Sequence, residues 1–203
     1  MASRLQTPPA EQIAEDVRCA LREDLGSGDC TAMLVPEHQA LETRVLCREN
    51  AVLAGQPWFT ETFRQLDPKI RIEWRARDGD RLAPDQEVLR MRGPARAVLS
   101  GERTALNFLQ TLSGTATRTR AYVDAVDGTG VTILDTRKTL PGLRLAQKYA
   151  VLCGGGSNHR IGLFDALLIK ENHIAASGSI RVAVEQAQQH YPDLLLEVEV
   201  ETL

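Results

Sequence analysis

The sequence predicts an N-terminal α+β unit followed by parallel β/α units. Helix and strand patterns are mixed over the first hundred residues, whereas strand and helix alternate from Val131 onward. Such alternation is typical of parallel sheets with right-handed crossovers. A length of 203 residues allows one or two domains. We therefore expect an N-terminal domain over residues 1–113, including a connecting helix, and a second domain over residues 114–203.

The first domain should begin with an amphipathic helix. Apolar residues recur every fourth position at Ile13, Val17, Leu21 and Leu25, and glycines follow directly. The later segments are expected in this order: strands over 42–47 and 51–54, a helix over 58–66, a strand over 70–74, a turn over 77–80 and a strand over 87–91. The pair Gly93-Pro94 is expected to interrupt the pattern. This domain reads as a scaffold.

A helix over 95–111 comes next, and Ser113-Gly114 should separate it from a second helix over 116–126. The alternating part then contains strands over 131–134, 166–169 and 194–200 and helices over 143–152 and 180–189. A complete eight-fold barrel needs about 250 residues. We therefore expect at most about half a barrel here.

Composition excludes several classes of protein. The chain is 43% hydrophobic, only 4% aromatic and has a formal charge of −3. This mild acidity carries no nucleic-acid or membrane signature, and no apolar run approaches the ~20 residues of a membrane span. The N-terminus lacks the apolar core of a signal peptide. The four cysteines show no CxxC spacing, so we expect reduced thiols in a cytoplasmic protein, without a zinc site or disulfide framework.

Basic residues are concentrated between Thr132 and Ile174. This stretch has a local formal charge of +3 inside a chain whose total is −3. The six bases end short apolar segments or lie beside glycines, which is typical of a site for small, highly anionic ligands. They are Arg137, Lys138, Arg144, Lys148, Arg160 and Lys170.

Two basic pairs stand at predicted junctions between strands and helices. Arg137 and Lys138 follow a strand, where β/α folds bind ligands; the alternative is an ordinary basic surface loop. His159 and Arg160 follow the glycine triplet 154–156, which is expected to aim them at the ligand. His159 is either a structural residue or a hydrogen-bond donor to a substrate carboxylate.

Further charged residues are candidates on later strands. Lys170 ends an apolar run, where a buried amine is costly unless it meets an anion. Glu197, Glu199 and Glu201 alternate with valines and should share one face. That face is either a solvated edge or a place where Mg²⁺ joins carboxylates to phosphate oxygens. Upstream, Arg103 is a candidate site residue; the alternative is that it forms a structural salt bridge.

Six segments resemble one known family. DTRKTLPGLR, KYAVLCGGGSNHR and LIKENHI are similar to signature segments of the quinolinate phosphoribosyltransferases, the nicotinate-nucleotide pyrophosphorylases (carboxylating) of NAD synthesis. REDLGSGDCTA, ENAVLAG and GERTALNFLQTLSGTAT match the same family in the same order. The resemblance runs from about Leu21 to Leu203. It implies an α+β sandwich domain followed by the α/β barrel of type II phosphoribosyltransferases, a barrel with fewer than eight strands that continues beyond Leu203.

The resemblance also implies site residues and partners. The implied substrate-binding residues are Arg103, Arg137, Lys138, His159, Arg160 and Lys170, and the implied catalytic residues are Lys138, Lys170 and Glu199. Arg103 would act in the neighbouring subunit's site, which implies a homodimer with a shared active site. Mg²⁺ is the implied cofactor, near Glu199; the choice of Glu199 over its two neighbouring glutamates is open.

The implied reaction joins quinolinate to phosphoribosyl pyrophosphate and releases nicotinate mononucleotide, pyrophosphate and CO₂. Two alternatives remain: a molybdenum-operon paralogue with another substrate, and a non-catalytic fragment that only dimerises or binds anions. The family's second acidic strand end and its Gly/Ser-rich phosphate segment are not among the 203 residues. We therefore expect the chain as written to have little transferase activity and to expose the strand over 194–200 as an edge.

Overall fold

The computed structural model describes residues 6–202, and contacts divide them into two compact units. The first unit ends at Asn158 and the second begins at His159. Strand–helix alternation in the second unit and mixed α/β content overall confirm the coarse fold prediction. No closed barrel is formed within residues 6–202. The predicted domain boundary near residue 113 stays a prediction.

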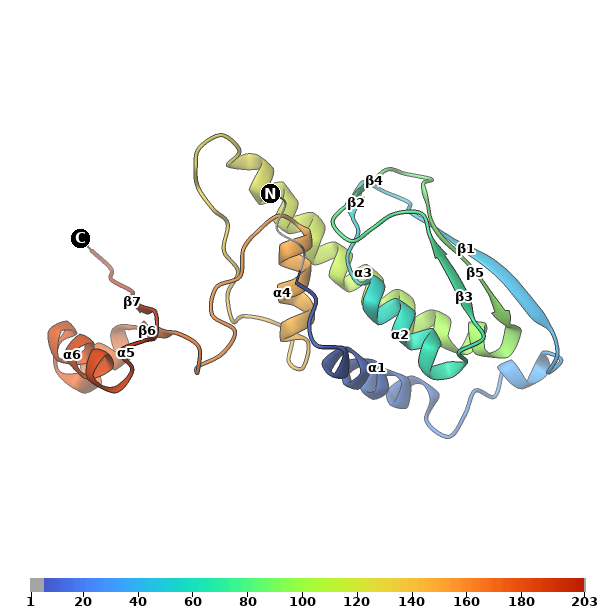
Figure 1. The fold of residues 1–203 in the computed structure, drawn as a ribbon, viewed down its shortest axis with the longest axis horizontal. Coiled ribbons are helices and arrows are strands. Elements are labelled where there is room, and N and C mark those ends of the chain that lie inside the picture. Colours follow the sequence, from blue (N-terminus) through green and yellow to red (C-terminus); the bar gives the residue numbers. More distant parts are fainter. Residues whose placement is uncertain (1–5, 203) are drawn as a thin grey trace. The chain divides into compact units, whose positions relative to one another are not determined.

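The first unit combines a small antiparallel sheet with four helices (Figure 1). The sheet has the order β1-β5-β3, and a separate two-stranded ladder pairs β2 with β4. The strands are β1 (Ala40–Leu46), β2 (Ala51–Val52), β3 (Arg71–Trp74), β4 (Arg81–Leu82) and β5 (Glu87–Pro94). The helices are α1 (Ala10–Leu25), α2 (Gln56–Leu66), α3 (Ala95–Ala125) and α4 (Arg144–Cys153), with a 3₁₀ turn η1 (Ala32–Leu34).

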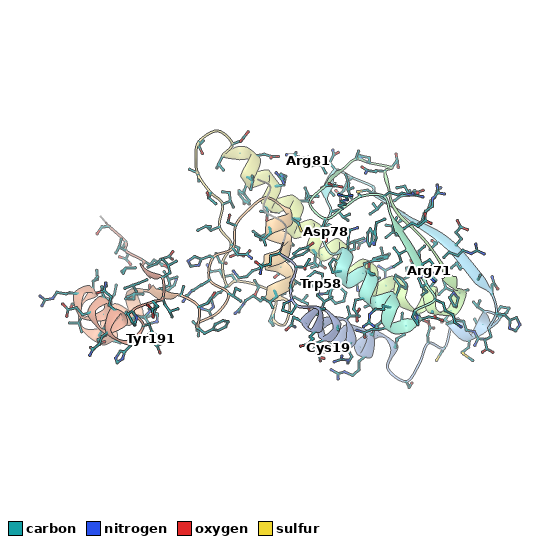
Figure 2. All side chains as sticks on the ribbon, viewed as in Figure 1. Cys19, Trp58, Arg71, Asp78, Arg81 and Tyr191 are labelled. Atoms are coloured by element: carbon teal, nitrogen blue, oxygen red, sulfur yellow. The ribbon has the colours of Figure 1, made fainter. Side chains whose placement is uncertain are left out.

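Two apolar clusters hold this unit together. One lies between the sheet and helices α2 and α3 and includes Phe59, Leu89 and Leu109. The other joins α1, α2, α3 and α4 and is centred on Trp58, which is fully buried (Figure 2). The Trp58 ring donates a 2.9 Å hydrogen bond from Nε1 to Asp16 on α1, so the one polar atom of the ring is satisfied. Helix α3 contributes residues to both clusters and therefore connects them within the first unit.

Helix α3 is continuous, so the expected break at Ser113-Gly114 is wrong. The Ser113 hydroxyl exchanges two hydrogen bonds with the backbone of Ala54, at 3.0 and 3.1 Å. Thr117 accepts the backbone N–H of Val52 at 2.8 Å. These contacts tie the middle of the helix to the segment around β2. Together with burial of Leu112, they outweigh the ~1 kcal/mol that a glycine costs inside a helix.

The expected interruption at Gly93-Pro94 is also wrong, because β5 runs to Pro94. Gly93 pairs with Leu41 and Pro94 with Ala40 at the end of the ladder. A Cβ on Gly93 would come within 2.5 Å of the Ile70 side chain. Glycine is therefore the residue that lets β5 pass close to Ile70, and proline is tolerated because it ends the strand.

Helix α4 is fixed to the N-terminal part of the unit by a buried polar contact. Tyr149 donates a 2.8 Å hydrogen bond to Asp78, which also accepts the backbone N–H groups of Gly55 and Gln56 at the start of α2. Burial raises the pKa of the Asp78 carboxyl, and these hydrogen bonds only partly oppose that rise. Burial also raises the pKa of the Cys153 thiol to about 12, so this cysteine stays protonated at neutral pH.

The strand expected over 131–134 is not formed. Only an isolated parallel bridge between Leu134 and Ser157 remains there, flanked by hydrogen bonds from Asp135 N to Ser157 O and from Ser157 N to Ile133 O. A strand requires a ladder of partners on at least one side. Among the described residues only this short contact is available, so the apolar run stays irregular.

The glycine triplet that precedes Ser157 packs against α3. A Cβ on Gly154 would lie 2.5 Å from the Thr119 Cβ and 2.6 Å from the Ala116 carbonyl oxygen. Gly155 has a φ of +86°, a conformation that L side chains rarely adopt. The triplet therefore allows a close approach of the loop to α3, a role that the sequence did not suggest.

The second unit is a small parallel β/α unit with β6 (Leu167–Ile169), α5 (Glu171–Ser177), α6 (Ile180–His190) and β7 (Leu196–Val198). Helix α5 was not predicted from the sequence. It begins directly after Lys170, whose backbone N–H donates to Nδ1 of His173 at 3.0 Å. This contact satisfies a donor at the helix start, as in a capping box. No helix within residues 6–202 is long and apolar enough to cross a membrane.

Candidate active site

The predicted site residues fall in both compact units. Arg103, Arg137 and Lys138 belong to the first, whereas the second contains His159, Arg160, Lys170 and Glu199. Within the first unit, Arg103 is exposed on α3. Arg137 and Lys138 lie in the loop between the Leu134 bridge and α4.

Hydrogen bonds within the loop and to α4 hold the segment that carries Arg137 and Lys138. The Lys138 backbone N–H donates to the Thr136 hydroxyl at 3.1 Å, and Thr139 N donates to the Arg137 carbonyl at 3.0 Å. Arg144 on α4 donates to the Thr139 hydroxyl at 3.3 Å. Lys138 is exposed and Arg137 is half-buried. The loop therefore presents the Lys138 amine to solvent and holds the Arg137 guanidinium against the unit.

The guanidinium of Arg137 has an unsatisfied donor. Its Nε is buried and has no hydrogen-bond partner among residues 6–202. A buried donor left unpaired costs about 1–3 kcal/mol. An anion bound at this side chain would supply the missing acceptor, so the geometry fits a carboxylate ligand.

Lys148 differs from the other bases of the cluster. Its side chain is only 2% exposed and its Nζ lies 2.5 Å from Asp135 Oδ1, whose side chain is 6% exposed. Lys148 is one of the six bases of the stretch from Thr132 to Ile174, and its charge is paired with Asp135 inside the protein.

In the second unit, Glu197 on β7 and Glu199, which directly follows that strand, each contact a basic residue. His159 Nε2 lies 2.7 Å from Glu197 Oε2, and Lys170 Nζ lies 2.7 Å from Glu199 Oε2. In the parallel ladder Glu197 is opposite Leu168, and the Glu199 backbone N–H donates to Ile169 O at 2.8 Å. That alternate glutamates share a face stays a prediction, and Glu201 is exposed near the end of the described chain.

The ligand-binding role of Lys170 stays a prediction, whereas its expected burial is wrong. Its amine meets an anion, the Glu199 carboxylate, but its side chain is 40% exposed and not buried. Only Ile169 of the preceding strand is buried, because this strand has a ladder partner on one side only.

Arg160 stands at the start of a tight turn. Its guanidinium donates to the Ala166 carbonyl at 3.4 Å. The Asp165 carboxylate closes the turn by accepting the backbone N–H groups of Ile161 and Gly162, at 2.7 and 2.8 Å. These hydrogen bonds therefore fix the backbone conformation of the turn that follows Arg160.

A metal site made wholly of protein side chains is not present in residues 6–202, where no three His, Cys, Asp or Glu residues are placed to share an ion. Glu199, with a side chain 53% exposed, offers one carboxylate. Mg²⁺ is commonly held by one or two carboxylates together with substrate phosphates. Glu199 therefore fits as a single protein ligand to such an ion.

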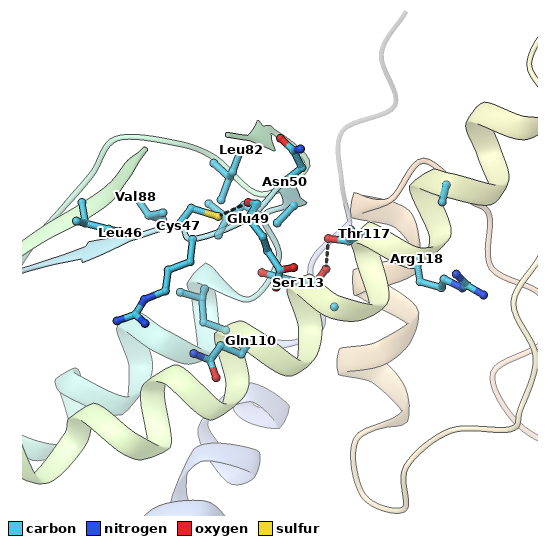
Figure 3. A pocket seen from close by; sticks show the side chains of 16 residues that line it. Leu46, Cys47, Glu49, Asn50, Leu82, Val88, Gln110, Ser113, Thr117 and Arg118 are labelled. Carbon is cyan, nitrogen blue, oxygen red and sulfur yellow. Dashed lines mark hydrogen bonds between the residues drawn. The ribbon is translucent and has the colours of Figure 1, made fainter. Parts of the chain in front are cut away.

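One cleft of the first unit contains none of the predicted site residues. It has a volume of about 730 Å³ and lies between the segment 46–51 and α3 (Figure 3). Two of its polar side chains bond to lining backbone groups: Cys47 donates to the Glu49 carbonyl at 3.0 Å and Thr117 to the Ser113 carbonyl at 2.7 Å. The basic residues, and not this cleft, remain the candidate site.

Contacts in the site region that were not predicted from the sequence include Lys148 with Asp135, Glu197 with His159, and His173 with the Lys170 backbone. The alternation of Glu197 with the valines was a signal for the second contact. Lys148 and Asp135 are thirteen positions apart in the sequence, and no local pattern predicts such a pair.

The fold, with two compact α/β units that both carry basic side chains, defines a two-part α/β chain. Residues 29–113 match the model of the quinolinate phosphoribosyl transferase N-terminal domain, and residues 115–203 match that of the C-terminal domain. The chain belongs to the quinolinate phosphoribosyltransferase family.

Individual relatives agree. The chain is 44% identical over 181 residues to a probable nicotinate-nucleotide pyrophosphorylase (carboxylating) of Bacillus subtilis, covering 89% of this chain and 63% of that protein. It is 40% identical to quinolinate phosphoribosyltransferase (decarboxylating) 1b of Nicotiana tabacum, covering 96% of this chain and 56% of the relative. The solved nicotinate-nucleotide pyrophosphorylase of Francisella tularensis superposes with a TM-score of 0.95 at 43% identity, covering 100% of this chain and 72% of the other. The chain thus spans less than two thirds of the length of the two curated relatives.

Proposed function

We propose that the chain provides the quinolinate-binding residues of an enzyme of de novo NAD biosynthesis. This enzyme converts quinolinate and phosphoribosyl pyrophosphate to nicotinate mononucleotide, pyrophosphate and CO₂. The family match supports the reaction. The observation that carries the proposal within the structure is Arg137, whose buried Nε has no acceptor among the described residues.

Quinolinate is a dicarboxylate, and the proposed ligands are cationic or can donate hydrogen bonds. Arg137 and Arg160 each offer a planar fork that matches a carboxylate. His159 contacts Glu197 through Nε2, at 2.7 Å, and would contribute a hydrogen bond to a substrate carboxylate. Arg103 is exposed on α3 and would act in the site of a second copy of the chain, which makes the proposed assembly a homodimer.

The reaction needs charge stabilisation at two places. As the pyridine nitrogen attacks the anomeric carbon of the ribose, negative charge grows on the departing pyrophosphate, and Lys138 and Lys170 would neutralise it. Glu199 would stabilise the positive charge that develops on the ribose. Mg²⁺, held by Glu199 and the phosphates, would supply Lewis-acid stabilisation of the same leaving group.

Decarboxylation follows from the product of the first step. Once ribosylated, the ring nitrogen is cationic and withdraws electrons from the adjacent carbon. The C–C bond between this ring carbon and its carboxylate breaks, CO₂ leaves, and the ring carbon takes a proton. This sequence requires no organic cofactor.

Several finer features belong to the same proposal. Residues 114–203 would form part of the barrel of type II phosphoribosyltransferases, following an α+β sandwich domain over residues 1–113. A cytoplasmic location stays a prediction.

The test of this proposal is quinolinate binding by Arg137→Ala. We expect the full-length protein to lose roughly 2–5 kcal/mol of binding free energy, the usual cost of removing one partner of a buried charge pair. Isothermal titration calorimetry measures this directly, with Arg181→Ala, an exposed arginine on α6, as the matched control. Unchanged affinity in Arg137→Ala would exclude this arginine from the site.

A further inference from the structure

A buried ion pair connects the loop before Arg137 to helix α4. Lys148 Nζ and Asp135 Oδ1 are 2.5 Å apart, and their side chains are 2% and 6% exposed. Lys148 is among the largest fully buried side chains of the described chain. An amine in this position cannot reach a substrate without leaving its partner, so it is not itself an anion ligand.

Asn158 completes the arrangement from a third segment. With its amide oriented so that both polar atoms are matched, its nitrogen donates to Asp135 Oδ2 at 2.8 Å and to the Lys148 carbonyl at 3.0 Å. The Leu134–Ser157 bridge adds backbone hydrogen bonds beside it. Both oxygens of the Asp135 carboxylate are therefore engaged, and three chain segments meet at one buried point.

Stability alone does not explain a buried charge pair here. Removing two charges from water is costly, and well-packed apolar residues of similar size often give equal or greater stability. What a pair of charges adds is a single allowed arrangement, because each group is satisfied only in one geometry. Asp135 lies two residues before Arg137, and Asn158 directly precedes His159, so this geometry is set next to both proposed carboxylate-binding pairs.

We propose that Lys148, through Asp135 and Asn158, is a positioning residue that holds the Thr136–Lys138 segment in its ligand-binding conformation. The consequence for the substrate rests on the proposed function. The proposed loop conformation does not depend on that function, because contacts within the first unit set it.

The experiment compares three variants of the full-length protein. Lys148→Met/Asp135→Asn removes both charges without leaving one of them buried alone. Asn158→Ala removes only the amide donors and serves if the double variant does not fold. Tyr149→Phe is the matched control, because it deletes a buried hydrogen bond one residue away on the same helix, to Asp78, and leaves the ion pair intact.

Two measurements are made on each variant. Calorimetry gives the Kd for quinolinate, and hydrogen exchange reports the backbone amides of Asp135, Lys138 and Thr139, each of which is hydrogen-bonded. We expect the double variant to weaken quinolinate binding by about 10- to 100-fold, the scale of a displacement near 1 Å in a binding site. Faster exchange over 135–139 should accompany it, whereas Tyr149→Phe should alter neither quantity.

Each outcome decides the proposal. Wild-type Kd and wild-type exchange over 135–139 in a folded double variant would overturn it, and the same result in Asn158→Ala would overturn it if the double variant is unfolded. If the unmutated protein does not bind quinolinate, the proposed function fails. In that case hydrogen exchange alone decides: faster exchange in the variants supports the positioning role, and unchanged exchange refutes it.

Discussion

Gly154→Ala tests whether the glycine triplet is required for packing or for backbone freedom. Gly154 has φ −70° and ψ −8°, a conformation open to any residue, so alanine introduces no backbone strain. Its Cβ would lie 2.5 Å from the Thr119 Cβ and 2.6 Å from the Ala116 carbonyl oxygen. Carbon atoms in ordinary contact are about 3.5–4.0 Å apart. The loop must therefore move by about 1 Å away from α3.

The expected cost follows from these contacts. Overpacking of this kind costs about 1–3 kcal/mol. The lower entropy of alanine in the unfolded chain returns about 0.4–1 kcal/mol. Because the obstacles are a backbone carbonyl and a β-branched side chain on a helix, we take the upper part of the range. A net loss of about 2 kcal/mol, equivalent to a fall in Tm of about 4–8 °C, is expected.

Thermal and urea unfolding followed by tryptophan fluorescence measure this loss, since Trp58 lies in the same apolar cluster as Ala116 and Cys153. The matched control is Gly114→Ala on α3, where a Cβ meets nothing within 4 Å. That variant should gain up to about 1 kcal/mol from helix propensity. If Gly154→Ala were as stable as the unmutated protein, the packing argument for the triplet would be wrong.

The remaining predictions concern pH and assembly. The pKa of Asp78 is raised above its ordinary value of 3.8. The folding stability that this shift contributes is fully present below about pH 3.8 and is lost as the pH rises through the raised pKa. Asp78→Asn should therefore gain stability relative to the unmutated protein between pH 4 and 7 in urea titrations, and parallel pH profiles would contradict this. In the full-length protein, mixing Arg103→Ala chains with Arg137→Ala chains, each inactive alone, should restore part of the transferase activity. No recovery after demonstrated subunit exchange would rule out Arg103 acting in trans.

Elements with a strong local pattern were predictable from the sequence. The apolar stripe of Ile13, Val17 and Leu21 predicted α1, and the run ending at Lys170 predicted β6. The alternating glutamates predicted a strand with its carboxylates on one face, and two of them contact basic residues. In each case the signal lies within a few consecutive residues, because the periods of helices and strands are short.

Errors arose where a local signal was outweighed by distant contacts. Ser113-Gly114 resembles a helix end, yet the Ser113 hydroxyl binds the backbone of Ala54, fifty-nine residues away in sequence, and α3 continues. The apolar run over 131–134 resembles a strand, yet only one bridge supports it. Neither outcome is visible from propensity, because each depends on which backbone groups are available nearby in space.

The sequence by itself determined the family, the order of most elements and the identity of the basic side chains offered to an anionic ligand. Only the tertiary structure decided how these charges are paired. It paired Lys148 with Asp135, His159 with Glu197 and Lys170 with Glu199, and left the buried Nε of Arg137 without a partner among the described residues. The physical reason is that charge is a property of each residue, whereas pairing and burial depend on groups that the chain brings together from distant positions.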